Sequence, residues 1–406
     1  MVFNTSELAS QEWDVIIVGA GPGGSIAARD CANYGLKTLV IERRQEIGAP
    51  VRCGEGLGEV WMKKAGLEYD PTWCLKEMHG AVIYGPKKVK MVIPTENKGY
   101  IIERKMFEKK LASQAIKAGA KYLVKTQVVG VIKEDGFVRG VIAENAEGRF
   151  EFKAKLVIAA DGVDSQTAKY AGINTVNGLT EVDSGYEYEM EGLNIDYTDK
   201  IHIFVGNKIA PRGYVWIFPK SETRANVGIG ILGSEESKTA KEYLDEFIRS
   251  HPEIFKNAGI IEVKGGSVPV GAPLEKPYAN GLLLVGDAAH MVNPIHGGGM
   301  GTAMEAARIA ARIAKEAIES NNVSEEFLKK YADEWFEVRG NQLLQVLKVR
   351  KFFEKLSDDD MEKLGEIFTP ETLLEFSDGK KLKVFAKAFA KHPKLMLIAA
   401  KTLLAG

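Results

Sequence analysis

A glycine-rich turn near the N-terminus constrains the fold more than any other feature of the sequence. Residues 19–24 read Gly-Ala-Gly-Pro-Gly-Gly and fit the pattern G-x-G-x-x-G. The turn follows an apolar, β-branched run at 14–19 and precedes a helix-like stretch at 25–34. A second apolar run, 38–42, ends in Glu42, 23 residues beyond Gly19. This order predicts a strand–helix–strand unit of the Rossmann type that binds a dinucleotide.

The positions of this turn have separate roles in such a site. Gly19 permits the sharp turn, and Gly21, next to Ala20, lets a pyrophosphate approach the backbone. Gly24 lets the helix pack closely on the strand, and Glu42 can accept a hydrogen bond from a ribose hydroxyl. The helix N-terminus favours the anion. The alternative is a tight turn without a ligand, but the strand, helix and acidic residue together favour the dinucleotide site.

Composition excludes several classes of protein. Lys and Arg total 54 against 55 Asp and Glu, so there is no overall positive field to hold nucleic acid. Three cysteines, Cys31, Cys53 and Cys74, are too few for a disulfide framework or a four-cysteine metal site. They favour a reducing cytoplasm, and no signal peptide or apolar stretch long enough to span a membrane is predicted. His290 and His296 lack a third ligand at a suitable spacing, so no metal site is expected.

The strand and helix patterns of the first region return later in the chain. Residues 124–157 read as a meander of strands, with turn signals at 135–136 and 147–148. Residues 282–286 form another buried run, and an alanine-rich helical pattern follows at 302–318. The nucleotide-binding domain therefore resumes late in the chain.

From residue 184 to 233 the pattern has a period of two. Tyr186 and Tyr188 alternate with Glu187 and Glu189, which predicts a half-buried antiparallel sheet. We therefore expect an α/β protein with three parts. These are a Rossmann-type nucleotide-binding domain of residues 1–75, 100–170 and 265–322, an antiparallel-sheet substrate domain of residues 76–99 and 171–264, and a helical C-terminal region of residues 323–406.

Two further motifs make the expected cofactor specific. Residues 286–290 read Gly-Asp-Ala-Ala-His and precede glycines 297–299 at a helix start, and residues 160–162 read Ala-Asp-Gly. With the first turn, they resemble the three nucleotide motifs of the p-hydroxybenzoate-hydroxylase-like FAD proteins over about the first 320 residues. The resemblance implies bound FAD and assigns Asp161 to one of these motifs. It also implies that Asp287 binds the ribityl chain.

The same resemblance suggests further contacts with the cofactor. Gly298, Gly299 and Met300 would face the flavin pyrimidine at a helix N-terminus, which stabilises negative charge on reduced flavin. Arg104 matches a family arginine that reaches the cofactor, and Val128 matches the strand beside the adenine. Read without the family, Arg104 would be a surface ion pair and Val128 a core residue.

A second G-x-G-x-x-G at residues 228–233 suggests an NADPH site, but its context is wrong. It lies within the alternating region, and the next apolar run, 260–262, ends 34 residues after Gly228 rather than about 20. We therefore expect no separate nicotinamide-binding domain.

Two other segments resemble the archaeal geranylgeranyl reductases. They are a cysteine-glycine loop at residues 52–58 and the Y-x-W-x-F-P strand within residues 211–219. The resemblance implies that a geranylgeranyl lipid is the substrate. It also places Cys53, Gly54 and Gly56 beside the cofactor.

The residues of these segments also have readings independent of any family. Tyr214, Trp216 and Phe218 share one face of a strand and would form an aromatic wall for an apolar substrate or a flavin edge. Ordinary core packing is the alternative for the wall, and an inert buried thiol is the alternative for Cys53.

The implied chemistry requires an acid, because an isolated alkene is a poor hydride acceptor. We expect reduced flavin to deliver the hydride, with Tyr214 and Trp216 stabilising cationic character through their π faces. Cys53 or a bound water is the candidate proton source. An FAD-dependent aromatic monooxygenase and a non-catalytic prenyl-lipid carrier are rival functions. The electron donor, which could be ferredoxin, a deazaflavin or NAD(P)H, is left open.

The C-terminal segment, residues 380–406, carries seven lysines and no acidic residue, interleaved with apolar residues. This pattern is typical of a basic amphipathic segment that lies on an anionic bilayer. A solvated face on a packed helix is the alternative. The sequence thus predicts a cytoplasmic protein with a candidate peripheral contact on the inner face of the cell membrane.

Overall fold

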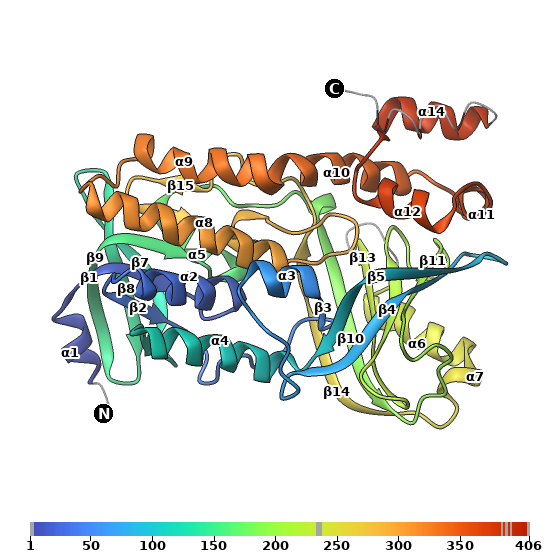
Figure 1. Cartoon of the computed structure of the whole chain (residues 1–406), viewed down its shortest axis with the longest axis horizontal. Helices are drawn as coiled ribbons and strands as arrows, with labels where there is room; N and C mark the ends of the chain where they lie inside the picture. Colours follow the sequence, from blue (N-terminus) through green and yellow to red (C-terminus); the bar gives the residue numbers. More distant parts are fainter. Residues whose placement is uncertain (1–3, 233–237, 383–384, 386–388, 390–391, 404–406) are drawn as a thin grey trace.

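The computed structural model describes residues 4–232, 238–382, 385, 389 and 392–403. Two sheets lie side by side along the long axis of the molecule (Figure 1). Helices α8 (Met300–Glu319) and α9 (Glu325–Trp335) run along the first sheet, and the remaining C-terminal helices continue over the second. The fold is the predicted α/β architecture, with a Rossmann-type half, a second sheet and a helical C-terminal region.

The first sheet is built on short apolar parallel strands. Its order is β15-β16-β9-β1-β2-β6, and β7 and β8 extend it beyond β9. The bounds are β1 Glu12–Val18, β2 Thr38–Ile41, β6 Lys121–Leu123, β7 Gln127–Glu134, β8 Phe137–Asn145, β9 Gly148–Ala159, β15 Tyr278–Ala279 and β16 Leu282–Leu284. The meander β7-β8-β9 turns after Glu134 and Asn145, which confirms that prediction. All four residues of β2 are buried because helices cover the central parallel strands.

Helices α2 (Pro22–Asn33), α4 (Arg104–Ala118) and α8 pack together beside this sheet. Small residues let α2 and α8 approach closely: a Cβ at Gly23 would lie 3.4 Å from the Cβ of Ala303. Shorter elements complete this half. They are α1 Thr5–Ala9, α3 Glu59–Lys64, α5 Gln166–Ala171, η1 Gly162–Asp164, η2 Leu179–Glu181 and η3 Gly286–Ala289.

The second sheet has the order β14-β10-β13-β12-β11-β4-β5-β3. The bounds are β3 Gly56–Gly58, β4 Cys74–Tyr84, β5 Lys90–Ile102, β10 Val182–Glu191, β11 Ile201–Val205, β12 Tyr214–Pro219, β13 Arg224–Leu232 and β14 Gly259–Pro269. Its strands pair antiparallel as predicted, except that β11 runs parallel to β4. Helices α6 (Ala240–Ser250) and α7 (Pro252–Phe255) cover one face through an apolar cluster.

The strand limits differ from the expected division of the chain. Three segments that were expected in the nucleotide-binding domain belong to the second sheet. They are β3, the start of β4 and the end of β5. β14 likewise extends to Pro269. These residues pair with the second sheet because the chain crosses between the halves several times. The domain division itself stays a prediction.

The C-terminal region is helical, as predicted. It comprises η4 Phe336–Gly340, α10 Asn341–Phe353, α11 Asp358–Ile367, α12 Pro370–Ser377 and α14 Pro393–Thr402. Ser357 caps α11, because its side chain accepts a hydrogen bond from the Asp360 N–H.

Part of the apolar side of the lysine-rich segment points inward, whereas Met396 and Leu397 are exposed. Leu382, Phe385, Phe389 and Leu395 are buried in a cluster with α10, α11 and α12. This packing favours the alternative of a solvated face on packed helices. Residues 383–384, 386–388, 390–391 and 404–406 of this segment lie outside the described residues. Within the described ranges, no helix is long and apolar enough to cross a membrane.

Candidate active site

A cavity of about 1170 Å³ lies between the two sheets and reaches the C-terminal helices. It is lined by all the predicted site residues except Gly24. The first sheet contributes the glycine turn, and the second contributes the cysteine loop and the aromatic strand. The two sets of motifs, far apart in sequence, therefore meet in one cavity.

The glycine turn has the geometry that its motif predicts. Gly19 has φ +98°, and a Cβ there would lie 2.4 Å from the carbonyl oxygen of Ala160. A Cβ at Gly24 would lie 1.9 Å from the Gly19 oxygen, so Gly24 serves helix packing rather than the cavity. Gly21 has nothing within 4 Å of a built Cβ and is the N-cap of α2. The backbone at Gly21 is thus open to an anion.

Glu42 holds the glycine turn while it lines the cavity. Its Oε2 accepts a hydrogen bond from the Ala20 N–H and its Oε1 accepts one from the Arg44 N–H, both at 2.8 Å. Each oxygen keeps a further acceptor site for a ribose hydroxyl. Val128 lines the same end of the cavity from β7.

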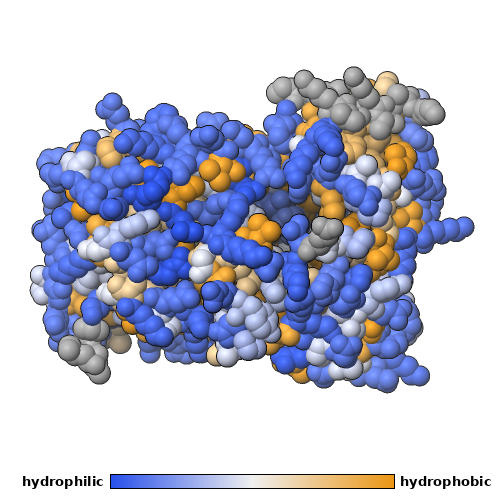
Figure 2. Space-filling model, viewed as in Figure 1, coloured by the Kyte–Doolittle hydropathy of each residue, from blue (hydrophilic) through white to orange (hydrophobic). Residues whose placement is uncertain are grey.

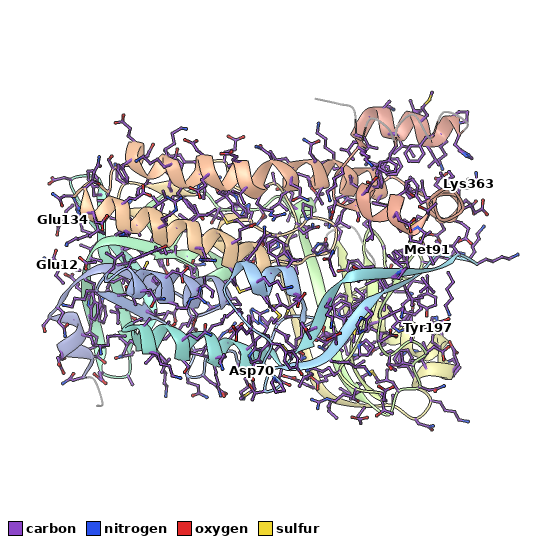
Figure 3. All side chains as sticks on the ribbon, in the orientation of Figure 1. Glu12, Asp70, Met91, Glu134, Tyr197 and Lys363 are labelled. Carbon is purple, nitrogen blue, oxygen red and sulfur yellow. The ribbon has the colours of Figure 1, made fainter. Side chains whose placement is uncertain are left out.

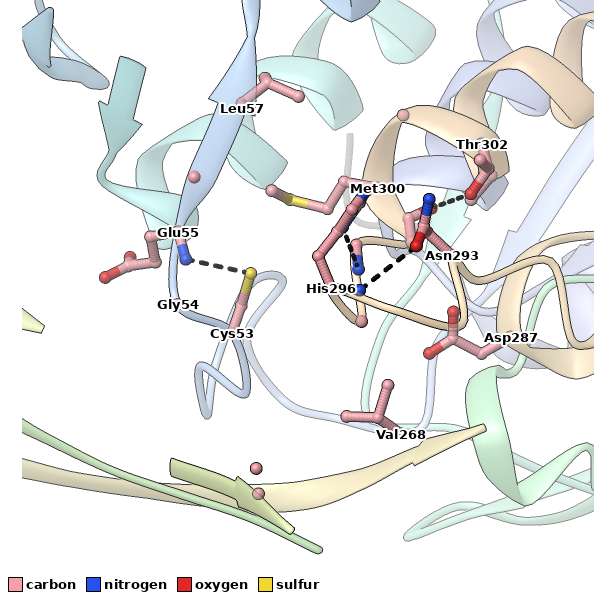
Figure 4. A pocket seen from close by; sticks show the side chains of 18 of the residues that line it. Cys53, Gly54, Glu55, Leu57, Val268, Asp287, Asn293, His296, Met300 and Thr302 are labelled. Atoms are coloured by element: carbon pink, nitrogen blue, oxygen red, sulfur yellow. Dashed lines mark hydrogen bonds between the residues drawn. The ribbon is translucent and has the colours of Figure 1, made fainter. Parts of the chain in front are cut away.

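Two aspartates follow the ends of neighbouring strands. Asp161 comes after β9, and its Oδ2 accepts a hydrogen bond from Thr167 N–H at 2.8 Å. Its Oδ1 is buried, and no described donor reaches it. Asp287 follows β16 and faces the cavity (Figure 4). Burial raises the pKa of both carboxyls.

A second open helix N-terminus completes the cofactor end. Gly299 is the N-cap of α8 and makes no side-chain capping bond. A Cβ at Gly299 would lie 3.0 Å from Asp287 Oδ1, so only glycine fits comfortably beside that carboxylate. This end of the cavity fits a bound FAD. The features that fit it are the open backbone at Gly21, the unsatisfied Asp161 oxygen and the N-termini of α2 and α8.

The cysteine loop lies across the cavity from His296 and Met300 (Figure 4). The Glu55 N–H donates to Cys53 Sγ at 3.2 Å, and burial raises the pKa of the Cys53 thiol. Arg104 lines this part of the cavity and also pairs with Glu108, with Nε and Oε1 2.6 Å apart. Arg104 therefore combines the ion pair of the plain alternative with a place at the cavity wall.

Tyr214, Trp216 and Phe218 form the predicted aromatic wall. All three are half-buried and line the cavity, with ring centroids 5.8 Å and 6.2 Å apart along the row. The Tyr214 hydroxyl donates to the His296 carbonyl at 2.7 Å, which ties the wall to the loop before α8. Gly54 and Gly56 lie beside the Phe218 ring.

The second glycine motif belongs to this wall and not to a nicotinamide site. Residues 228–232 of it fall in β13, where Gly228 and Gly230 pair with Trp216 and Tyr214 of β12, and Gly233 lies outside the described residues. A Cβ at Gly228 would lie 2.2 Å from the Trp216 ring. The glycines let the indole lie flat on the sheet, which is the physical reason for their spacing.

A group of buried charged and polar side chains beneath the wall was missed by sequence reasoning. We call it the buried floor. It consists of Glu55, Glu187, Glu189, Lys220, Asn226 and Lys264, each at most 5% exposed. The Tyr and Glu alternation predicted a half-buried sheet, but in β10 both faces are covered around these residues. The register that places Glu187 on β10 opposite Lys264 on β14 brings the group together, and it depends on the pairing of strands that are far apart in the sequence.

The floor is held by short ion pairs. Lys220 Nζ lies 2.7 Å from Glu55 Oε2 and 2.9 Å from Glu189 Oε2. Burial acts to raise the pKa of Glu189, but the hydrogen bond and charge of Lys220, together with Lys264 and Arg224, outweigh it and bring the pKa to about 2. Lys264 and Lys220 likewise lower the pKa of Glu55 against the effect of burial.

Comparison with known proteins supports this arrangement. Residues 14–187 match the family described as FAD dependent oxidoreductase, and residues 181–268 match the geranylgeranyl reductase catalytic domain. The chain is 43% identical to the digeranylgeranylglycerophospholipid reductase of Methanocaldococcus jannaschii, covering 95% of this chain and 96% of that protein.

The chain belongs to the digeranylgeranylglycerophospholipid reductase family. The Methanosarcina acetivorans member is also 43% identical, covering 87% of this chain and 88% of that protein. A crystal structure described as a geranylgeranyl bacteriochlorophyll reductase-like protein from Thermoplasma acidophilum matches with a TM-score of 0.88 at 38% identity, covering 97% and 99% of the two chains.

More distant structures share the fold alone. The flavin-dependent brominase Bmp2 has a TM-score of 0.73 at 18% identity, covering 95% of this chain and 100% of that one. The predicted FAD-dependent class is confirmed by the family. Membership in a reductase family also favours the predicted reductase over the aromatic monooxygenase and the prenyl-lipid carrier. The roles of individual residues stay predictions.

Proposed function

We propose that this chain is an FAD-dependent reductase that saturates the isolated double bonds of geranylgeranyl chains in archaeal membrane lipid precursors. The observation that carries this proposal is the family relationship over nearly the whole chain, with 43% identity to a digeranylgeranylglycerophospholipid reductase. The cavity supports it, because it joins the cofactor motifs to a long apolar region.

The apolar end of the cavity suits an isoprenoid chain. It lies between the β4–β5 hairpin, β11 and the C-terminal helices, and its lining includes Ile83, Val89, Met91, Ile93, Ile203, Val205, Met361, Leu364, Phe368 and Leu373. Figure 3 labels Met91 on β5, near the C-terminal helices. On the face shown in Figure 2, apolar side chains are spread over both halves, including the end that carries the C-terminal helices.

One contact holds this end of the cavity together. Glu362 on α11 accepts hydrogen bonds from the backbone N–H groups of Lys87, Lys88 and Val89 at 3.2, 2.6 and 2.8 Å. The carboxylate thereby fixes the hairpin tip against the helix. A chain of isoprene units entering here would be directed along the apolar lining toward the aromatic wall.

Particular residues would hold the cofactor. Gly21 and the N-terminus of α2 would bind the pyrophosphate, Glu42 the adenosine ribose, and Asp287 the ribityl chain. The N-terminus of α8 would stabilise negative charge on the flavin. When bound and reduced, FAD supplies the hydride for alkene reduction.

The aromatic wall would act on the substrate. The faces of Tyr214 and Trp216 carry negative quadrupole charge toward the cavity and would stabilise positive charge on an alkene carbon. The wall also excludes water from that carbon. Cys53 stands beside it as a predicted proton source.

The proposal includes an external electron donor and a peripheral membrane contact. The donor would be ferredoxin, a deazaflavin or NAD(P)H. For the membrane, Met396 and Leu397 on α14 are 46% and 57% exposed, with Lys401 in the last turn of the helix. A lipid substrate would be drawn from a bilayer beside this helix.

Product analysis tests the function. The holoenzyme is reduced chemically without oxygen and incubated with a geranylgeranyl phospholipid, and the lipid is analysed by mass spectrometry. Products that gain two hydrogens for each double bond support the proposal. Recovery of unchanged lipid from fully reduced, FAD-loaded protein would overturn it.

A further inference from the structure

His296 stands in the loop before α8, where hydrogen bonds hold its backbone on both sides. Its carbonyl accepts the Tyr214 hydroxyl at 2.7 Å. Its N–H donates to Asn293 Oδ1 at 3.2 Å, and the same oxygen accepts the Ile295 N–H at 2.9 Å. The Asn293 N–H in turn donates to the Gly298 carbonyl at 3.0 Å. The loop therefore presents the His296 side chain from a fixed position, where the cofactor end meets the aromatic wall.

The imidazole ring of His296 is fixed as well. Its Nδ1 accepts a hydrogen bond from the Gly298 N–H at 3.1 Å. A Cβ at Gly298 would lie 2.6 Å from the ring carbon Cε1 and 2.7 Å from Nδ1, so the ring lies directly against the glycine. The side chain is exposed to the cavity and stands across it from Cys53 (Figure 4).

The bond to Nδ1 decides which ring nitrogen carries the proton. Because Nδ1 is an acceptor, the neutral ring has its proton on Nε2. A charged ring would carry a second proton on Nδ1, directly opposed to the Gly298 N–H. Desolvation inside the cavity lowers the pKa of His296, although the charge of Asp378 acts against this. His296 is therefore a neutral donor rather than an acid, and no hydrogen-bond partner of Nε2 is found within the described ranges.

The order of groups along FAD places the flavin ring beside His296. The cofactor is a chain of adenosine, pyrophosphate, ribityl and flavin ring, and Glu42, Gly21 and Asp287 are the proposed contacts of the first three parts. The ring would then extend beyond Asp287 toward the aromatic wall, because the hydride has to reach an alkene held there. A Cβ at Gly299, three residues after His296, would lie 3.0 Å from Asp287 Oδ1. The space between His296 and the cysteine loop is the part of the cavity that remains for the ring.

We propose that His296 is a cofactor-contacting residue, which donates its Nε2–H to the flavin ring and thereby binds reduced FAD more tightly than oxidised FAD. This inference rests on the proposed function, which places the ring next to the wall. Reduced flavin carries more negative charge than oxidised flavin, so a fixed N–H dipole in a site with little water stabilises it more. His296 makes the bound cofactor easier for the external donor to reduce.

The test is the two-electron midpoint potential of bound FAD, measured without oxygen in the parent, His296→Leu and His296→Gln holoproteins. Leucine removes the donor, and we expect reduced FAD to lose about tenfold in affinity relative to oxidised FAD, which lowers the potential by ~30 mV. Glutamine keeps a side-chain N–H at about the reach of Nε2. Its potential should lie within about 15 mV of the parent, or about threefold in relative affinity.

The matched control is His79→Leu, the same substitution on β4. His79 lies outside the cavity lining and its side chain is 48% exposed, so the potential should equal that of the parent. Titration of the apoproteins with oxidised FAD separates the proposed role from a structural one. A disturbed loop would weaken the binding of both oxidation states alike and leave the potential unchanged. A parent-like potential in His296→Leu would overturn the inference, as would an equal fall in His296→Leu and His296→Gln.

A second measurement uses the parent protein and needs no turnover. Nitrogen-15 NMR of the histidine-labelled apoprotein reports the tautomer, with the His296 signals identified by their loss in His296→Gln. We expect the proton on Nε2 near pH 7 and a change in that signal when reduced FAD binds. A ring protonated on Nδ1 would overturn the inference. A parent with the expected potentials that leaves geranylgeranyl lipid unchanged would instead contradict the proposed function.

Discussion

The two sheets use charged residues in opposite ways. In the first sheet the parallel strands are apolar toward their carboxyl ends, and Glu42, Asp161 and Asp287 all follow those ends, as expected at a parallel-sheet switch point. In the second sheet, Glu187 and Lys264 lie within the strands and under the cavity. A contiguous motif can therefore build the cofactor end, whereas the reactive end needs distant strands to meet.

This difference has an energetic consequence. In the first half each polar group at the cavity sits beyond the end of its strand, so its loss removes local hydrogen bonds, such as the two that Glu42 accepts, and leaves no buried charge unpaired. The buried floor of the second half differs, because its charges lie within the strands and are compensated mainly by one another. Substitutions of polar groups at the cavity in the first sheet should therefore affect ligand binding more than folding. Substitutions in the buried floor of the second sheet should affect both folding and the reaction.

The largest expected effect comes from removing the centre of the floor. Glu55→Ala removes one of the two carboxylates that Lys220 and Lys264 share and also removes the acceptor of the Arg104 N–H. Urea denaturation should show a loss of about 3 to 5 kcal/mol in the free energy of unfolding. Glu59→Ala, which breaks an exposed pair with Lys63, should cost less than about 1 kcal/mol. Equal losses of unfolding free energy in Glu55→Ala and Glu59→Ala would contradict the expected difference between buried and exposed charges.

A smaller effect separates two glycines of the first half. Gly24→Ala places a Cβ 1.9 Å from the Gly19 oxygen and should lower apoprotein stability by about 1 to 3 kcal/mol. Gly21→Ala meets no atom within 4 Å, so apoprotein stability should stay within about 0.5 kcal/mol. The new methyl occupies the anion position, and FAD affinity should fall by at least about tenfold, or 1.4 kcal/mol. Isothermal titration with FAD measures the affinity, and thermal unfolding measures the stability of the apoproteins. Undiminished FAD affinity in Gly21→Ala would contradict the assignment of Gly21 to the pyrophosphate site.

The smallest effect concerns the exposed face of α14. Leu397→Glu should weaken sedimentation with anionic vesicles by a factor of about 5 to 30, corresponding to ~1 to 2 kcal/mol, through loss of apolar burial in the bilayer. Ile116→Glu, at a similarly exposed position on α4, is the control and should sediment like the parent. If both variants bind equally, α14 does not contact the membrane.

The two halves also differ in how far the sequence predicts them. The sequence could indicate the cofactor-end positions of the first half, because each role depends on neighbouring residues. These positions are the turn at residues 19–24, Glu42, Asp161 and the glycines before α8. The aromatic wall could be predicted too, since alternate residues of one strand share a face.

The buried floor could not be predicted, because its contacts are remote in sequence. Lys264 meets Glu55 across 209 residues and Glu189 across 75. The alternation of Tyr186 and Glu187 indicates that the two faces of β10 differ, but not whether the polar face meets water. The parallel pairing of β11 with β4, also remote in sequence, was missed for the same reason.

The central claim is that the cofactor bound by the first half reduces an alkene held at the wall of the second. Stopped-flow reoxidation of pre-reduced holoenzyme without oxygen tests it directly, with geranylgeranyl lipid and its fully saturated analogue. We expect reoxidation by the unsaturated lipid alone. We also expect Trp216→Leu to retain FAD but to react about 5 to 30 times more slowly, corresponding to ~1 to 2 kcal/mol. Reoxidation by both lipids, by neither, or at the parent rate in Trp216→Leu would contradict this claim.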